Sequence, residues 1–386
     1  MTVHPFPARM APEVALAALA ELPAGSVVLD PMAGSGTVLR AAMDGGLTAI
    51  GFDVDPLAVL IAGVWTSPLS PSRLRREALA VVERAEVNLS APNALPWIDN
   101  DAATKAFIDF WFGPVQQQAL RSLVSALPEG NEPLTSALRL AVSRTIITKD
   151  RGASLARDVS HSRPHKVRHE NEFDVLKAFG AAAARIARAL EDRAPSAGAS
   201  VRLGDARNLK TISDGSISAV VSSPPYLNAI DYMRGHKLAL VWLGYTVGHL
   251  SSIRSGSIGS ERAPAREMAT RAAELLQLGP ALTGLPIRLQ RMFSRYLTDL
   301  EMVLAEMARV LAPAGRAVLV IGNSNQRGVL IDNAEAVTTL SRLAGLKLVS
   351  RYERDLPVSS RYLPTSRDTP LEKRMHKELV LSFVHD

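Results

Sequence analysis

The stretch VVLDPMAGSGTVL, residues 27–39, constrains the fold more than any other part of the sequence. An apolar run ends at Asp30, a turn containing Gly34 and Gly36 follows, and a helical pattern begins directly after it. A strand that leads through a glycine-rich turn into a helix is typical of the first unit of a parallel, doubly wound sheet. Glycine has no Cβ and lets the backbone approach a ligand closely. The turn is therefore predicted to bind a ligand.

The rest of the chain repeats this alternation of strands and helices. After a first strand at 26–30, a second is predicted at 48–55, with helices at 11–22, 36–46 and 56–65. Further strands are predicted at 199–205, 216–223, 316–324, 346–354 and 378–384, and helices at 293–311 and 333–344. The last two strands follow each other without a helix, so we expect a hairpin-like pair. The pattern predicts an α/β fold with a doubly wound, seven-stranded, mostly parallel, Rossmann-like sheet.

Two stretches interrupt the alternation. Residues 66–198 carry mainly amphipathic helical patterns, whereas about 234–291 is predicted to be irregular. We therefore expect 1–65 and 199–386 to form one domain, with a mainly helical insertion at 66–198 and an irregular one at about 234–291.

The composition excludes several classes of site. The chain of 386 residues has no cysteine, which excludes disulfides, thiolate zinc sites and cysteine nucleophiles. No apolar run approaches a membrane span, and the first residues lack the layout of a signal peptide, so a cytoplasmic protein without membrane contact is expected. The formal net charge of +6 favours an anionic partner.

Three kinds of ligand use a turn of this type. A nucleoside triphosphate requires a Lys-Ser/Thr pair after the last glycine, but here Thr37 and Val38 follow. A dinucleotide requires a third glycine three residues after Gly36, and that residue is Leu39. S-adenosylmethionine (SAM) fits better, because its ammonium group needs a carboxylate and Asp30 ends the strand.

Carboxylates also follow the next two predicted strands. A single one is commonly a helix cap, but three on successive strands beside a glycine turn favour a cofactor site. We expect Asp53 to bind the ribose hydroxyls and Asp205 to meet the adenine amine. The complete predicted SAM site comprises Asp30, Pro31, Met32, Ala33, Gly34, Ser35, Gly36, Thr37, Asp53, Asp205 and Ala206.

Four segments together resemble the amino-group DNA methyltransferases. They are HPFPARMAPEVALAAL (4–19), VLDPMAGSGTVLRAA (28–42), GFDVDPLAVLIA (51–62) and VVSSPPYLNAIDY (220–232). In that family they correspond to a leading segment that packs against the cofactor, the glycine motif, the ribose acid and the catalytic S/D/N-P-P-Y corner. The resemblance covers roughly 1–65 and 199–386. The insertion at 66–198 departs from the family pattern and is a candidate DNA-binding or target-recognition element.

The resemblance implies a SAM-dependent enzyme that methylates an exocyclic base amine of double-stranded DNA. The target base would be flipped out of the duplex, and a cognate restriction or defence system is a possible partner. Family members with Asp or Asn at the first corner position mostly act on adenine N6, while Ser goes with cytosine N4. Ser223 therefore favours cytosine N4, with adenine N6 as the alternative.

The corner Ser223, Pro224, Pro225 and Tyr226 has a chemical explanation beside the plain one of a turn. An exocyclic amine is a poor nucleophile, because its lone pair is delocalised into the ring. The Ser223 hydroxyl and Pro224 carbonyl can accept its two N–H groups and free that lone pair. The prolines fix this geometry, and Tyr226 offers a face for stacking on the base. Transfer would be a direct in-line displacement, whereas methylation at cytosine C5 normally needs the missing cysteine.

Other functions stay open on the sequence alone. An RNA base methyltransferase shares this fold and a similar corner, although no RNA-binding appendage is evident. A catalytically silent nucleic-acid-binding subunit would not need Asp30, Asp53 and the corner together. A small-molecule methyltransferase would leave the basic stretches unexplained.

A basic stretch at 148–169 carries six Arg or Lys against two Asp, together with three histidines. We interpret it as a mobile basic arm over a phosphate backbone, with a solvated loop as the alternative. The predicted nucleic-acid-binding residues are Arg157, Arg163, Lys166 and Arg168. Pro164 interrupts the register of His161, His165 and His169, so no metal site is predicted. Residues 254–262 and 361–377 are similar basic candidates.

Overall fold

The computed structural model describes residues 2–6, 9–147, 151–157, 166–191, 197–226, 231–260, 274, 286–326, 329–357 and 376–385. The chain forms two compact units. The helical unit comprises Met1–Pro7, Asp55–Pro195 and Ile230–Arg254. The sheet unit comprises Ala8–Val54, Ser196–Ala229 and Ser255–Asp386. Each unit is therefore assembled from three separate stretches of the chain.

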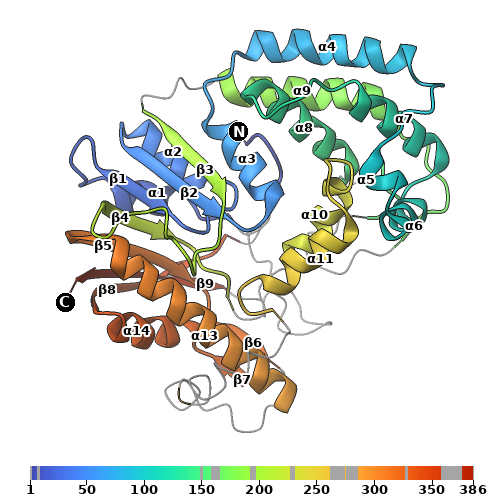
Figure 1. Ribbon diagram of the computed structural model, residues 1–386. Helices are drawn as coiled ribbons and strands as arrows, with labels where there is room; N and C mark the ends of the chain where they lie inside the picture. The colour runs from blue at the N-terminus through green and yellow to red at the C-terminus, as the bar shows by residue number, and fades with distance from the viewer. Residues whose placement is uncertain are drawn as a thin grey trace. The chain divides into compact units, whose positions relative to one another are not determined.

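The sheet unit contains a seven-stranded sheet in the order β3-β2-β1-β4-β5-β9-β8 (Figure 1). Its strands are β1 (Val27–Asp30), β2 (Thr48–Asp53), β3 (Ala199–Leu203), β4 (Ile217–Ser222), β5 (Leu311–Ile321), β8 (Leu346–Asp355) and β9 (Lys377–His385). All neighbouring strands pair in parallel except β9, which is antiparallel to both β5 and β8. The predicted fold class is confirmed, including the final antiparallel pair.

The central strands are buried because they are apolar on both faces, as expected for a parallel sheet. Leu29, Val220 and Leu319 pack in one core cluster with α13 (Ile287–Val310) and α14 (Asn333–Leu343). Their neighbours along each strand point to the other face. There α1 (Pro12–Leu19) and α2 (Thr37–Asp44) contact each other and the strands β1, β2 and β4. The parallel strands bring their carboxyl ends to one edge of the sheet.

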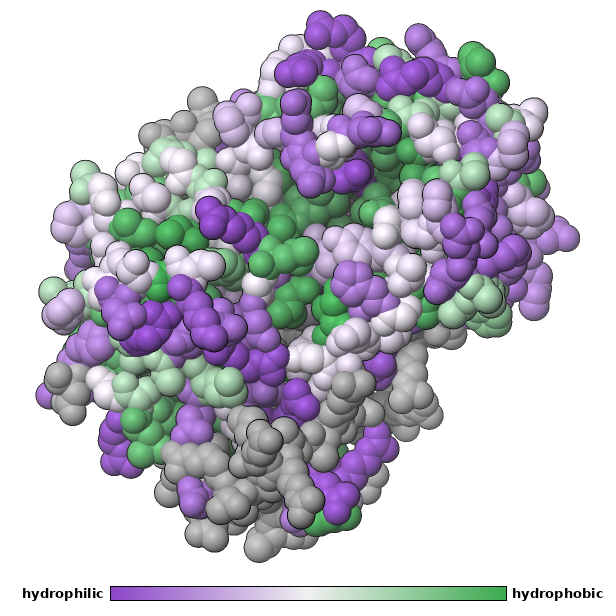
Figure 2. Space-filling model, viewed as in Figure 1, coloured by the Kyte–Doolittle hydropathy of each residue, from purple (hydrophilic) through white to green (hydrophobic). Residues whose placement is uncertain are grey.

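The helical unit is built from nine described helices. They are α3 (Pro56–Thr66), α4 (Pro71–Val87), α5 (Pro96–Asp99), α6 (Ala102–Trp111), α7 (Pro114–Ser125), α8 (Pro133–Ile146), α9 (Val175–Glu191), α10 (Tyr232–Leu240) and α11 (Val247–Gly256). Helix α4 buries Leu74, Ala78, Val81 and Ala85, a single stripe at helical spacing. The remaining α4 surface is mainly hydrophilic at the top of Figure 2.

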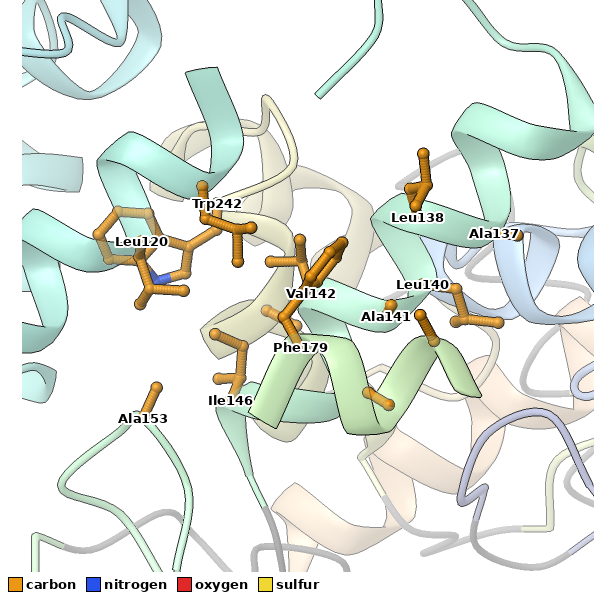
Figure 3. Packing of buried hydrophobic residues seen from close by; sticks show 14 of the residues in the cluster. Leu120, Ala137, Leu138, Leu140, Ala141, Val142, Ile146, Ala153, Phe179 and Trp242 are labelled. Atoms are coloured by element: carbon orange, nitrogen blue, oxygen red, sulfur yellow. The ribbon is translucent and has the colours of Figure 1, made fainter. Parts of the chain in front are cut away.

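The core of this unit forms around α8, which buries most of its residues. Figure 3 shows Val142 and Ile146 of this helix packed with Phe179 of α9 and with Trp242. Phe112 meets Trp242 edge to face, with ring centroids 5.2 Å apart. Trp242 is fully buried, and it follows α10 directly in the chain. Residues far apart in the sequence thus share one core.

The structure differs from the expectation of an irregular insertion at about 234–291. The described part of this stretch contains most of α10, all of α11 and the first residues of α13. Gly235 and several serines obscure the helical period in the sequence. Helix α10 nevertheless buries Met233 and Leu238 in the helical-unit core, and this burial outweighs local propensity. Both α3 and α10 therefore belong to the helical unit rather than to the predicted sheet domain.

Two smaller features were not predicted. A short antiparallel hairpin forms from β6 (Ser324–Gln326) and β7 (Val329–Ile331). Strand β5 begins at Leu311, five positions before the expected 316, and its pairing with β4 shifts register between Ile217 and Ala219. None of the helices in the described ranges is long and apolar enough to cross a membrane.

Candidate active site

Two backbone hydrogen bonds fix the glycine turn after β1, one to β2 and one within the turn. Ala33 N donates to Phe52 O at 2.8 Å, and Gly36 N donates to Ala33 O at 2.8 Å. Gly34 and Gly36 have φ of +50° and +80°, the left-handed region where a side chain is strained. Gly36 is also the residue from which α2 starts. The two glycines are thus required by the turn itself.

Asp30 ends β1 as a buried carboxyl group, 3% exposed. Its Oδ1 accepts hydrogen bonds from Ser222 Oγ at 2.7 Å and from Met32 N at 3.2 Å. Burial raises the pKa of Asp30 to about 7, and the nearby Asp53 adds to the shift, against these two hydrogen bonds. A ligand with a positive charge beside Asp30 would favour its ionised form.

Asp53 ends β2 beside the turn. Its Oδ2 accepts a hydrogen bond from Gly34 N at 2.8 Å, so the turn and the second strand end are joined directly. The sequence did not single out Gly51, two residues earlier. A Cβ at Gly51 would lie 2.6 Å from Leu39 Cδ1 and 3.2 Å from Ala33 Cβ. A glycine inside a predicted strand was the available signal for this close approach.

The other predicted turn residues lie together with these carboxylates in the sheet unit. Pro31, Ala33, Ser35 and Thr37 are buried, whereas Met32 is half-buried and packs against the α13 core. The hydroxyls of Ser35 and Thr37 lie 3.4 Å apart. The residues of the predicted turn are therefore packed together and mostly shielded from solvent.

Asp205 lies two residues beyond β3 and is held by Arg207, which the sequence reasoning missed. Arg207 Nε bonds to both Asp205 oxygens, at 2.9 and 3.1 Å, and Nη2 bonds to Oδ2 at 2.5 Å. Arg207 Nη1 also binds Asp299 Oδ1 at 2.6 Å. Burial alone would raise the pKa of Asp205, but the Arg207 contacts hold it below its ordinary value. The carboxylate is therefore engaged with a cation, while the adjacent Ala206 is buried.

The corner follows the end of β4 at Ser222. Ser223 Oγ donates to Val320 O of β5 at 3.0 Å. With its proton used in this way, the Ser223 hydroxyl keeps its lone pairs to accept further hydrogen bonds. Ser222 was not predicted as a site residue, yet its hydroxyl joins the corner to Asp30. In the sequence, the only indication of a role for Ser222 is that it directly precedes Ser223 at the end of the predicted strand.

The rest of the corner is partly enclosed. Pro224 is buried, and Pro225 and Tyr226 are half-buried. Tyr226 packs against the core cluster around α13. Burial raises the pKa of the Tyr226 hydroxyl, and the charge of Glu378 raises it further. Glu378 is a second residue near the corner that sequence reasoning did not identify.

The leading segment is divided between the two units. In the helical unit Val3 is buried, Arg144 Nη1 donates to Val3 O at 2.7 Å, and His4 Nε2 lies 3.0 Å from Ser143 Oγ. The rest of the leading segment, with α1, belongs to the sheet unit. Residues 2–6 thus pack on α8, where the resemblance led us to expect contact with a cofactor.

The basic stretch is only partly an exposed arm. Ala153, Ser154 and Leu155 are buried, and Leu155 N donates to Trp111 O at 2.8 Å. The expectation of a mobile arm is therefore wrong for these residues, and Ala153 packs in the helical-unit core. Arg157 is exposed, and Lys166 Nζ lies over the Phe110 ring at 5.2 Å from its centroid.

The remaining residues of the basic stretches differ in exposure, and several lie outside the described residues. Arg168 is half-buried in the helical unit, and Arg163, His161 and His165 lie outside the described residues. His169 is exposed, and no group of three metal-ligating side chains occurs in the part of the chain that the structure describes. In the 254–262 candidate, the carbonyl of Gly256 and the N–H of Gly259 bind Arg207 and Asp299. Of 361–377, only residues 376–377 are described.

Comparisons with known proteins give distant likenesses only. No family model matches the sequence, and no curated protein matches it. Among solved structures, a TehB-like SAM-dependent methyltransferase from Corynebacterium glutamicum is 11% identical, with a TM-score of 0.31 over 98% of this chain and 89% of that chain. The rRNA methyltransferase aviRa from Streptomyces viridochromogenes is 13% identical, with a TM-score of 0.33 over 98% and 87% of the two chains.

A candidate DNA modification methylase from Thermus thermophilus is 16% identical, with a TM-score of 0.25 over 47% of this chain and 50% of that chain. These identities and TM-scores are too low to assign an activity. The fold therefore rests on the observed strand order, and the function rests on the residues at the sheet edge.

Proposed function

We propose that this protein is a SAM-dependent DNA methyltransferase that modifies an exocyclic base amine, with cytosine N4 as the first choice. One observation carries the proposal. The hydrogen bond between Ser222 and Asp30 joins the S-P-P-Y corner to the glycine turn, so a methyl donor in the turn and an amine at Ser223 would meet at one edge of the sheet. Adjacent placement of two reactants is a major source of rate acceleration.

The donor groups around the turn fit SAM. The buried carboxylate of Asp30 accepts hydrogen bonds from two uncharged donors, Ser222 Oγ and Met32 N. It would bind the ammonium group of SAM. The turn 31–37 would contact the amino-acid part of SAM, and Asp53 would bind the ribose hydroxyls. Asp205 and Ala206 would lie at the adenine, with Arg207 fixing the Asp205 carboxylate. When bound, SAM supplies an activated methyl group on its sulfonium.

The corner would activate the amine. Ser223 Oγ donates its hydrogen bond to Val320 O, which leaves its lone pairs available. The Ser223 hydroxyl and the Pro224 carbonyl would each accept a hydrogen bond from one N–H of the base. These contacts localise the nitrogen lone pair, which forms the new N–C bond as the C–S bond breaks. The methylated amine then loses one proton to water, and no covalent bond to the enzyme forms. Half-buried Tyr226 would stack on the flipped base.

The choice of DNA rests on the resemblance of the four motif segments and on the net positive charge. The neutral Ser223 favours cytosine N4. A carboxylate at this position would be repelled by the ring N3 lone pair of cytosine, whereas the neutral hydroxyl carries no charge to oppose that lone pair. Adenine N6 and an RNA base amine are the alternatives that the same corner chemistry permits.

A filter-binding assay with tritiated SAM tests this proposal. Purified protein is incubated separately with unmethylated genomic DNA, total RNA and no nucleic acid. We expect label to accumulate on DNA alone. Tritium incorporated into RNA alone would show that RNA, not DNA, is the substrate. No incorporation into either nucleic acid, by protein that binds SAM, would refute a nucleic-acid substrate. Ser223→Ala protein serves as the inactive control.

A further inference from the structure

Asp205 lies at the same edge of the sheet as Asp53. Strands β2 and β3 run in parallel, and Asp53 pairs with Leu203, two residues before Asp205. Gly204 N donates a hydrogen bond to Asp53 O at 3.0 Å, and a Cβ at Gly204 would lie 2.6 Å from Phe52 Cδ1. The close approach of these two strand ends places Asp205 next to the residue that is proposed to bind the ribose.

Within the described part of the chain, the Asp205 carboxylate accepts hydrogen bonds from Arg207 alone. The donors are Arg207 N at 3.0 Å, Nε at 2.9 Å and Nη2 at 2.5 Å. Although burial alone would raise the pKa of Asp205, the Arg207 contacts lower it, so the group is ionised at neutral pH. An ionised carboxylate has about four acceptor sites, and these three donors leave about one of them for a ligand. An N–H of the adenine amine is a donor that fits this site.

Asp299 of α13 holds Arg207 in place. Its Oδ1 accepts a hydrogen bond from Arg207 Nη1 at 2.6 Å, and its Oδ2 accepts from Gly259 N at 3.0 Å and from Arg295 Nε at 3.4 Å. Arg207 Nη2 also donates to Gly256 O at 2.6 Å. The contacts of Asp299 and Arg207 therefore fix both the guanidinium and the segment that follows α11.

Exposure rises along this row of side chains, from Asp299 through Arg207 to Asp205. The Asp299 side chain is 7% exposed, that of Arg207 is 14% exposed, and that of Asp205 is 35% exposed. Water screens a buried ion pair less than an exposed one, so Asp299 holds the guanidinium firmly. A ligand can reach Asp205, while Asp299 acts on that carboxylate only through Arg207.

A structural tie between α13 and the loop after β3 exists apart from Asp299. Leu209 N donates to Glu306 Oε2 at 2.5 Å, and Arg309 Nη2 donates to Leu209 O at 3.0 Å. Asp299 lies about two helical turns before Glu306 on the same helix. It differs from Glu306 because its partner Arg207 binds the carboxylate that is proposed to meet the adenine.

We propose that Asp299 is a positioning residue that, through Arg207, orients the Asp205 carboxylate toward the amine of the SAM adenine. The inference rests on the proposed binding of SAM. The paired contacts between a guanidinium and a carboxylate fix the direction of the carboxylate as well as its place. A base with a carbonyl oxygen instead of the amine would be rejected, because that oxygen and the Asp205 carboxylate are both acceptors.

Calorimetry with S-adenosylhomocysteine and S-inosylhomocysteine tests the inference, since the second ligand has a carbonyl oxygen where the first has the amine. We expect the parent to bind the adenosyl ligand more tightly by about tenfold or more. In Asp299→Asn this preference should fall by about fivefold, because Arg207 loses the charged partner that fixes it. Glu306→Gln alters the structural tie on the same helix and should keep the parent preference.

Arg207→Lys covers failure of Asp299→Asn to fold, since lysine keeps the charge but cannot form the paired contacts with a carboxylate. It should show the same loss of preference. An unchanged preference in the folded variants, or an equal weakening of both ligands, would show a structural role and overturn this inference alone. So would a parent that binds the two ligands equally well. A parent that binds neither SAM nor S-adenosylhomocysteine would instead overturn the proposed function.

Discussion

Asp30 is the residue whose chemistry bears most directly on the proposed binding of SAM. Its pKa of about 7, raised chiefly by burial, means that half of the carboxyl groups are protonated near neutral pH in the free protein. An ammonium group requires the ionised form. Below pH 7, binding must therefore expel a proton, and this cost weakens the affinity as pH falls.

We predict that the Kd for SAM rises by about tenfold between about pH 8 and about pH 6, the change expected for a single group with this pKa. Calorimetry in buffers of different ionisation enthalpy measures both the affinity and the released proton. In Asp30→Asn the amide oxygen can still accept from Ser222 and Met32, so the fold should persist, with weaker and pH-independent binding. A parent affinity that is constant over this range would contradict the role of Asp30.

The two adjacent serines should have separable roles. Ser223→Ala removes an acceptor for the amine and should lower the single-turnover rate by about 10²-fold, with SAM affinity nearly constant. Ser222→Ala removes a hydrogen bond to a buried carboxylate and should weaken SAM by about tenfold. Each variant is the control for the other. Equal effects of both on rate and affinity would show that the serines only end a strand.

At the scale of elements, the strands with a glycine turn and the helical character of 66–198 were predictable, whereas the helices α10 and α11 were not. The segments around Asp30 and Asp53 alternate strand and helix with clear turn signals, and the structure follows them. The charge pairs around Arg207 and Glu378 could not be predicted, because they join residues from distant strands and helices. Their partners depend on strand order and register, which a single sequence does not specify.

Gly51 tests how closely the turn must pack on β2. Its substitution by alanine places a Cβ 2.6 Å from Leu39 Cδ1, and Leu39 is fully buried. We expect Gly51→Ala to lower the free energy of unfolding by about 1–3 kcal/mol, as for other overpacked cores, and to weaken SAM binding. Gly198→Ala, with no atom within 4 Å of the added Cβ, is the matched control. Denaturant unfolding of both variants measures the difference, and equal stabilities would refute the close packing.

At the scale of the whole molecule, the sequence suggested one domain with two insertions, whereas the chain forms two units from interleaved stretches. The first residues and α10 join the helical unit through buried side chains such as Val3 and Leu238. Their apolar character is visible in the sequence, but nothing local shows which core they enter. The motifs therefore indicated which segments form the sheet, but not which of the two units the first residues, α3 and α10 belong to.

The net positive charge of the whole chain leads to a prediction about the salt dependence of DNA binding. Binding of DNA should weaken steeply with salt, and removal of Arg157, Arg163 and Lys166 should reduce the slope of log K against log[salt] by about 2–3. Alanine at Lys105, Lys177 and Arg188, three exposed bases on helices of the same unit, removes equal charge and should change the slope less. Fluorescence anisotropy at several salt concentrations measures this. Identical slopes for both triple variants would dismiss a specific contact by the basic stretch.

The central claim is that the corner transfers a methyl group from SAM to a base amine. Its most direct test is mass spectrometry of nucleosides from unmethylated genomic DNA that has been incubated with the parent protein and SAM carrying a deuterated methyl group. We predict labelled N4-methylcytosine, absent with Ser223→Ala protein. Labelled N6-methyladenine alone would contradict the choice of base. Absence of any labelled nucleoside, with SAM binding intact, would contradict the claim itself.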